Sequence, residues 1–257
     1  MLRVTSGLCA LMVLLLSGCQ TSENSNAEPF SLATLAVEKY YVAPDCQGEN
    51  CSAVTVSALE FPQSPELTEQ LQARLLTLAM GITEESALPA ESWDGYAQNF
   101  FDLATEDSQV RPDFMASEAL LKADVYAHHN DLLVLELNSY VYHAGQAHGL
   151  PMTEFMVIDE RQQRVVTGDD MLLGGQQEAF QAVLGQAHQR WMAEMEQDEQ
   201  FAATWPLSDS RNIAPLETGW EVKYNVYDIA PYAVGQPSLT ITTDELEGIA
   251  KPRYLGH

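Results

Sequence analysis

The sequence is poor in basic residues: 12 lysines and arginines stand against 37 aspartates and glutamates in 257 residues, a formal charge of −25. Such a chain repels both the phosphates of nucleic acids and the anionic headgroups of membranes. We therefore exclude nucleic acid as a partner, and we exclude docking on a membrane through a basic patch. The hydrophobic share of 46% is still sufficient for a packed core, so the chain is not expected to be disordered.

The sequence also lacks the local signatures of common enzyme and cofactor classes. It has no Gly-x-Ser-x-Gly, His-Glu-x-x-His or Cys-x-x-Cys motif and no glycine-rich phosphate-binding loop. Adjacent acids such as Asp169 and Asp170 occur, but 37 acids produce neighbouring pairs by chance. A glycan hydrolase stays an alternative, because such enzymes need only two carboxylates roughly 5 to 9.5 Å apart. No cofactor is expected.

No apolar run is long enough to span a bilayer, which takes about 20 residues. The longest run, residues 8–16, follows Arg3 and is closed by Ser17-Gly18-Cys19. This order of features predicts a signal peptide over residues 1–18. Its end resembles the lipobox of bacterial lipoproteins, which implies cleavage before Cys19 and lipidation of the Cys19 thiol. An ordinary signal peptide that ends in Gly-Cys by chance is the alternative.

The residues after the cysteine indicate where the chain is held. Gln20, in place of aspartate, resembles the sorting pattern of outer-membrane lipoproteins, so we expect a lipid anchor in the outer membrane, on its periplasmic face. The membrane is then contacted through the lipid only. Residues 19–30 are small and polar and predict a flexible tether. Residues 31–257 follow as one domain.

Two cysteines remain once Cys9 has left with the signal peptide and Cys19 carries lipid. Cys46 and Cys51 are close together in a compartment that oxidises thiols, which predicts a disulfide. The turn-forming residues between them indicate that the bridge closes a hairpin. A zinc site is a weaker alternative, because two cysteines without a histidine pair do not complete a ligand set.

Hydropathy periods predict an α+β domain in which helices pack on one face of an antiparallel sheet. Alternation with a period of two indicates strands, and apolar residues three or four apart indicate helices. The acidic residues around 194–199 are interpreted as a solvated helix end. Strands are expected at 32–42, 52–61, 119–128, 133–142, 153–159 and 220–227, helices at 64–81, 93–103 and 176–196, and a short strand with a terminal helix at 238–249.

Two loops have an unusual composition. The first carries His143 and His148 together with Gly145 and Gly149, and two imidazoles alone do not specify a metal geometry. We expect His148 to hold the loop by hydrogen bonds, with metal binding through His143 and His148 as a weak alternative. The second loop, residues 227–235, is dense in tyrosine around Pro231. Tyrosine is typical of recognition surfaces but also fills ordinary cores, so both interpretations stay open.

The two loops together carry a resemblance to a known family. Tyr142-His143-Ala144-Gly145-Gln146-Ala147-His148-Gly149 and Tyr224-Asn225-Val226-Tyr227-Asp228-Ile229-Ala230-Pro231-Tyr232-Ala233-Val234-Gly235 resemble the paired motifs Gly-Gly-Ala-His and Tyr-Glu-Ile-Ala-Pro-Tyr-Ala-x-Gly. These motifs mark the RsiV-like family of extracytoplasmic domains, a domain of unknown function. The resemblance covers residues 33–250, and it departs from the family at Gln146, where glycine is usual.

The resemblance implies an α+β module that recognises something at the cell wall without catalysing a reaction. Family members include the outer part of a lysozyme-sensing anti-sigma factor, accessory domains of peptidoglycan deacetylases and stand-alone lipoproteins. The implied partner is a cationic protein such as lysozyme, or a component of peptidoglycan. The candidate contact surface comprises Tyr140, Tyr142, His148, Gly149, Tyr227, Asp228, Pro231 and Tyr232.

The excess of acidic residues is compatible with two roles, and both stay open. It would speed encounter with a basic partner, yet it would equally keep a secreted protein soluble in salty surroundings. A structural envelope lipoprotein, which has no soluble ligand, is a further alternative function.

Overall fold

The structure is a computed structural model, and it describes residues 31–44, 46–47, 50–82, 89–110 and 116–256. The expected signal peptide, Cys19 and the tether over residues 19–30 lie outside these residues. None of the described helices is long and apolar enough to cross a membrane.

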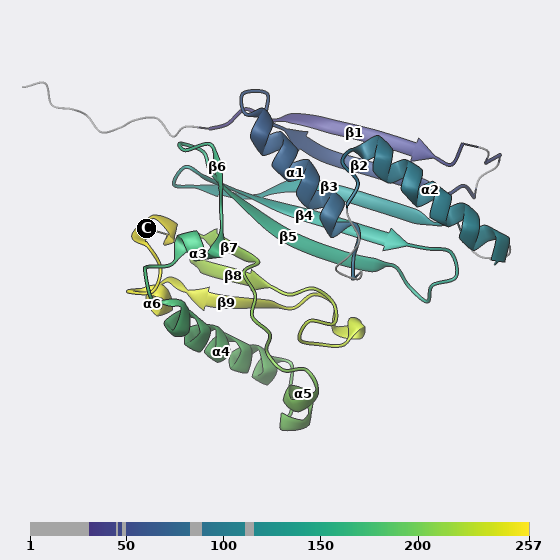
Figure 1. Ribbon diagram of the computed structural model, residues 1–257. Helices are drawn as coiled ribbons and strands as arrows, with labels where there is room; N and C mark the ends of the chain where they lie inside the picture. Colours follow the sequence, from purple (N-terminus) through teal and green to yellow (C-terminus); the bar gives the residue numbers. More distant parts are fainter. Residues whose placement is uncertain (1–30, 45, 48–49, 83–88, 111–115, 257) are drawn as a thin grey trace, which may run out of the picture.

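A six-stranded sheet forms the larger part of the fold (Figure 1). Its strands follow one another in sequence order, and all neighbours are antiparallel except β2 and β3, which run parallel. The α+β class is therefore confirmed, with a mixed sheet in place of a purely antiparallel one. The parallel pair arises because two helices connect β2 to β3, a crossover that returns the chain in the same direction. The strands are β1 (Leu35–Val42), β2 (Ala53–Glu60), β3 (Glu118–His129), β4 (Leu132–Tyr142), β5 (Leu150–Asp159) and β6 (Arg164–Val166).

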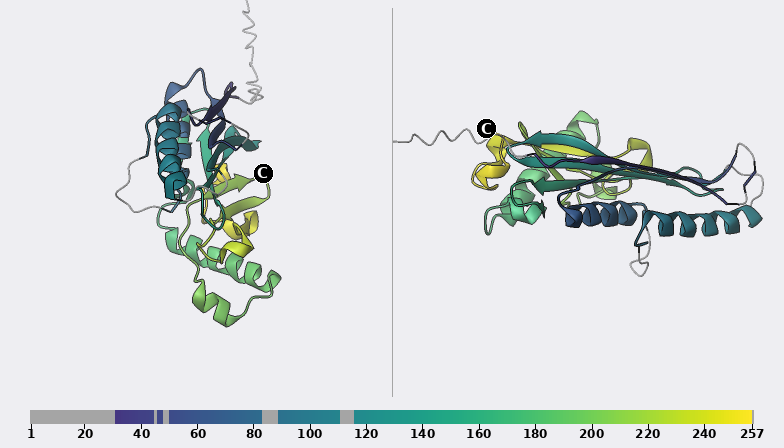
Figure 2. Two further views of the ribbon diagram at one scale, coloured as in Figure 1. Left: turned by 90° about the vertical axis from the view of Figure 1, so that its right-hand side faces the viewer. Right: turned by 90° about the horizontal axis from the view of Figure 1, so that it is seen from above.

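The two connecting helices cover one face of this sheet, as Figure 2 shows. Helix α1 (Pro65–Leu78) begins at a proline, whose fixed φ suits the first helical position, and it buries an apolar stripe that includes Leu71. Helix α2 (Trp93–Val110) buries Phe100 and neighbouring aromatic and alanine side chains in the same core. Both helices are confirmed where the apolar spacing predicts them.

A second, three-stranded sheet packs beside the open face of β4 and β5. Its outer face is covered by a long helix, and the ring of Trp220 lies 5.8 Å from that of Phe180 there. The elements of this part are α3 (Gly168–Met171), α4 (Gln177–Glu194), α5 (Glu199–Thr204), β7 (Ile213–Leu216), β8 (Gly219–Lys223), η1 (Tyr232–Val234), β9 (Ser238–Thr242), α6 (Thr243–Leu246) and η2 (Pro252–Tyr254).

The strand expected over residues 220–227 is wrong in its second half, since β8 ends at Lys223. The backbone N–H of Asn225 donates to the carboxylate of Asp228 at 2.8 Å, and Tyr227 has a φ of 71°. This side-chain bond replaces a ladder bond and turns the chain. The acidic run at 194–199 also does more than form a solvated helix end. Asp198 accepts a hydrogen bond from Phe201 N–H and caps α5.

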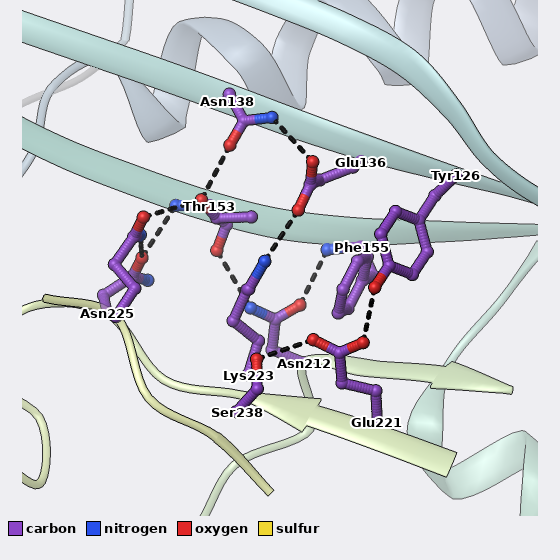
Figure 3. A network of polar contacts seen from close by, with 11 residues as sticks. Tyr126, Glu136, Asn138, Thr153, Phe155, Asn212, Glu221, Lys223, Asn225 and Ser238 are labelled. Carbon is purple, nitrogen blue, oxygen red and sulfur yellow. Dashed lines mark hydrogen bonds and ion pairs between the residues drawn. The ribbon is translucent and has the colours of Figure 1, made fainter. Parts of the chain in front are cut away.

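Two asparagines join the second sheet to the free edge of β5 (Figure 3). Strand β6 pairs with β5 only at residues 157–159, so the edge at Thr153 and Phe155 has no neighbouring strand. The Asn225 amide oxygen accepts from Thr153 N–H at 2.7 Å. Asn212 accepts from Phe155 N–H at 2.6 Å and donates to the Thr153 carbonyl at 2.9 Å. Side-chain amides thus satisfy strand-edge groups that would otherwise be exposed or unpaired.

A charged contact continues this junction between the sheets (Figure 3). Lys223 on β8 donates to Glu136 on β4 at 2.7 Å, with side chains only 16% and 22% exposed. The Lys223 ammonium also lies 5.3 Å from the centre of the Phe155 ring. Tyr126 of β3 donates to Glu221 of β8 at 2.5 Å. The sheets are therefore held together by specific polar contacts as well as by apolar packing.

The first described residues enter at the end of the sheet where β3 turns into β4. Leu32 N–H donates to the buried carboxylate of Glu160 at 2.8 Å, and His128 Nε2 lies 2.5 Å from the other oxygen of that carboxylate. Burying a carboxylate is costly unless it is bonded in this way. Glu160 thereby fixes the position of Leu32 at this end of the sheet.

The asparagine junction predicts a large stability effect for Asn212→Ala. The substitution leaves the Phe155 N–H and Thr153 carbonyl without their partner, at a cost of about 2–4 kcal/mol. Urea unfolding should show this loss with an unchanged m value. The exposed Asn99→Ala on α2 is the control and should change the free energy by about 0.5 kcal/mol or less. Equal effects of the two substitutions would contradict this role for Asn212.

Candidate functional site

The two unusual loops meet at one end of the large sheet, although they are far apart in the sequence. The rings of His148 and Tyr232 stack with their centres 3.6 Å apart and their planes 20° apart. The Tyr227 hydroxyl lies 3.3 Å from His148 Nε2, and the Tyr227 ring centre lies 5.8 Å from that of Tyr232. The structure thus brings together three of the residues that the sequence predicts for the contact surface.

The carbonyl of Gly149 holds this cluster in place. It accepts from the Tyr232 hydroxyl at 2.9 Å and lies 3.1 Å from His148 Nδ1. Because a carbonyl can only accept, Nδ1 is the donor in this contact, and the Nε2 atom faces the Tyr227 hydroxyl. The expectation that His148 hydrogen-bonds its loop matches this geometry.

A tyrosine from β4 covers the same glycine. The ring of Tyr140 lies so close to Gly149 that a Cβ atom there would overlap the ring. Gly149 is buried, Tyr140, Pro231 and Tyr232 are half-buried, and Tyr227 is 40% exposed. The cluster is therefore a packed patch whose rings reach solvent, which is the condition for a contact surface.

Tyr142 does not belong on an exposed surface, contrary to the expectation. Its side chain is only 7% exposed. Tyr142 pairs with Glu118 across interior strands β4 and β3, where neighbours lie on both sides. The ring still contributes to the wall of a groove beside the cluster.

The structure separates the two loop histidines. His143 packs against Phe100 of α2, with ring centres 5.3 Å apart, and its Nδ1 lies 3.8 Å from Asp107. Burial lowers the pKa of His143, and Asp107 opposes this shift. His148 instead stacks on Tyr232, so the two imidazoles do not converge. Among the described residues there is no group of three or more histidine, cysteine or acidic side chains that could hold a metal ion.

The adjacent acids Asp169 and Asp170 have structural partners. Asp170 accepts from the backbone N–H and the hydroxyl of Thr167, both at 2.9 Å, and closes a capping box on α3. The Thr167 hydrogen bonds lower the pKa of Asp170. Asp169 accepts from Arg211 at 3.1 Å. A general acid needs a raised pKa, so Asp170 does not have the character of the acid in an acid–base couple.

A cleft of about 430 Å³ lies between the two sheets and contains further acids. Glu154 pairs with Arg74, and Asp209 pairs with Arg211 at 2.6 Å. Burial raises the pKa of Asp228, while the hydrogen bond from Asn225 opposes the shift. The Asp228 carboxylate thus accepts the hydrogen bond that forms its turn. Each acid named in this cleft therefore has a partner, and no two of them form a pair of carboxylates without partners.

A groove of about 520 Å³ adjoins the tyrosine cluster. It lies between the loop of residues 146–149 and the β1–β2 hairpin, and its lining includes Tyr40, Glu118, Tyr140, Tyr142 and His148. The sequence does not identify Tyr40, because its approach depends on the order of the strands and on the parallel pairing of β2 with β3. It does not identify Glu118 either, because the place of Glu118 depends on the register of β3 against β4. The one signal in the sequence is Tyr40 itself, a tyrosine at an outward-facing position of an edge strand.

Cys46 and Cys51 are joined by a disulfide in the connection between β1 and β2. Cys51 also lines the groove, so the bridge belongs to one of its walls. The placement agrees with the hairpin expected from the turn-forming residues between the two cysteines.

Comparisons with known proteins identify a family but no activity. A family model described as "Protein of unknown function (DUF3298)" matches residues 169–244. A crystal structure of a DUF3298 family protein from Pseudomonas aeruginosa is 32% identical with a TM-score of 0.75, covering 89% of this chain and 99% of that one. A DUF3298 member from Bacteroides fragilis is 20% identical with a TM-score of 0.65, covering 88% and 96%, and shows the shared fold. No curated protein matches the chain.

The contact between Tyr140 and Gly149 predicts that Gly149→Ala is destabilising. The added methyl group displaces the Tyr140 ring, and overpacking of this kind costs about 1–3 kcal/mol. Urea unfolding measures the loss. Gly174→Ala is the matched control, since nothing lies within 4 Å of its Cβ position. A loss at Gly174 as large as that at Gly149 would rule out the ring contact as the cause.

The environment of His143 predicts a pH effect on stability. Because the folded state lowers the pKa of His143 below its ordinary 6.5, the unfolded state binds the proton more tightly. The contribution of the neutral His143 to the free energy of unfolding is complete above pH 6.5. It is lost as the pH falls through the lowered pKa of the folded state. His143→Phe should therefore lose less stability than the native protein between pH 7.5 and pH 5. Urea unfolding at pH 7.5 and at pH 5 measures the free energy of unfolding of both proteins. If the variant and the unsubstituted protein lose the same free energy between these pH values, the prediction is wrong.

Proposed function

The chain belongs to the DUF3298 family, whose function is unknown, and on this premise we propose that it is a non-catalytic binding module of the cell envelope. Its partner is a cationic protein of the lysozyme type. One observation carries the proposal: two loops from different sheets build a single solvent-reaching cluster of His148, Tyr227 and Tyr232. Such aromatic side chains offer contact area at little cost in side-chain entropy.

The arrangement of acids supports binding in preference to catalysis. Asp169, Asp170 and Asp228 are each engaged in an ion pair, a cap or a turn, and the tyrosine cluster itself contains no carboxylate pair among the residues that the structure describes. The formal charge of −25 attracts a basic protein over a distance and accelerates its encounter. Close contacts at the aromatic cluster would then determine how long the complex lasts.

The position of the cluster suits a module held by a lipid on Cys19. Leu32 is bound by Glu160 at one end of β4, whereas Tyr140 and the cluster lie at the other end. The 11 residues of this strand span roughly 35 Å, at about 3.4 Å per residue. A tether to the periplasmic face of the outer membrane would thus present the cluster on the side away from the anchor.

Binding of lysozyme to the immobilised protein tests this proposal. Screening shortens the range of the attraction, so the association rate constant should fall about tenfold or more between roughly 20 mM and 300 mM salt. Tyr227→Ala should weaken the affinity about tenfold or more by removing a central contact. Leu103→Ala, an exposed apolar residue on α2, is the control and should leave the affinity unchanged. Absence of binding at low salt, or binding of purified peptidoglycan alone, would refute the cationic-protein partner.

A further inference from the structure

We propose that the groove beside the tyrosine cluster is a pocket for one cationic side chain, an arginine or a lysine. The identity of the donor, a basic protein, rests on the proposed function, but the pocket itself is defined by groove residues alone. Three of these are tyrosines, namely Tyr40, Tyr140 and Tyr142, and one is an acid, Glu118.

The strand register places the aromatic rings around the acid. Glu118 on β3 pairs with Tyr142 on β4, and Leu120 pairs with Tyr140. Residues two apart in a strand point to the same face, so all four side chains share the face that α1 and α2 leave open. Tyr40 reaches the groove from β1, two strands away on the other side of β3. The acid therefore lies between tyrosines contributed from both directions.

The carboxylate of Glu118 has no counter-ion within the described part of the chain. Glu118 is exposed, and none of the described lysines and arginines is within ion-pair distance of it. By contrast, Lys122 on the same strand pairs with Asp124 at 2.9 Å, and Lys223 pairs with Glu136. The groove therefore combines an available negative charge with aromatic side chains, and both kinds of group attract a cation.

The groove also has the dimensions and the burial that such a ligand requires. Its volume of about 520 Å³ admits a whole arginine or lysine side chain but not a folded segment. Tyr142 is only 7% exposed, so the wall that it forms is shielded from solvent. Tyr40 is 70% exposed and lies at the open side of the groove. A cation held against a dry aromatic wall is screened less by solvent than one on an open surface.

Titration of the purified protein with N-acetyl-arginine amide, followed by amide NMR shifts, tests the pocket. We expect saturable shifts at residues 117–118 and 140–149. N-acetyl-citrulline amide has nearly the same shape without the charge and should bind roughly fivefold more weakly or not at all. Glu118→Gln and Tyr40→Leu should each weaken arginine-amide binding by roughly fivefold.

Glu178→Gln, an exposed acid at the start of α4, is the control for loss of one negative charge and should have no effect. Equal affinity for the citrulline probe, an affinity for arginine amide that Glu118→Gln leaves unchanged, or no shifts with arginine amide each overturn the pocket. These results are separable from the lysozyme experiment. A protein that binds arginine amide but not lysozyme retains the pocket and loses the proposed partner, and the reverse result retains the partner and loses the pocket.

Discussion

The candidate site depends on the way in which two asparagine side chains complete the edge of β5. Asn212 and Asn225 bond to backbone groups of Thr153 and Phe155 that no strand pairs with, and so they fix the smaller sheet against the larger one. Asn225 has a second role, because its own N–H is bound by Asp228 in the turn that precedes the tyrosine loop. Asn225 thus ties the position of the tyrosine loop, residues 227–235, to β5, the strand that follows the loop of His143 and His148.

Much of the fold follows from local sequence patterns. The two helices over the large sheet, the β3–β4 hairpin and the long helix α4 have regular apolar periods, and the structure places them where those periods predict. The short elements β6, β7 and α5 have no period long enough to recognise, and they form because tertiary contacts or a cap such as Asp198 support them. The turn after Lys223 is not predicted, since alternation continues in the sequence while a side-chain bond turns the backbone.

The candidate site is only partly predictable for a related reason. Its loops are unusual in composition, so His148, Tyr227 and Tyr232 are recognisable in the sequence, and the resemblance to a known family links them. Burial is decided by three-dimensional neighbours, which is why the expectation of an exposed Tyr142 is wrong. Tyr40 lies near the cluster only because β2 and β3 run parallel, and a pairing between distant strands leaves no mark on either segment. Glu118 is placed there by its pairing with Tyr142 in the β3–β4 hairpin.

The bond between Leu32 and the buried Glu160 has a mechanical consequence. A pull on the residues before Leu32, with a partner held at the far end of the sheet, acts along the strands and not across them. The force would then be shared by all the backbone hydrogen bonds between β1 and β2, which pair β1 residues from Leu35 to Val42. These bonds would not break one after another. Such a force would therefore act on β1 in shear and would not peel this strand from the edge of the sheet.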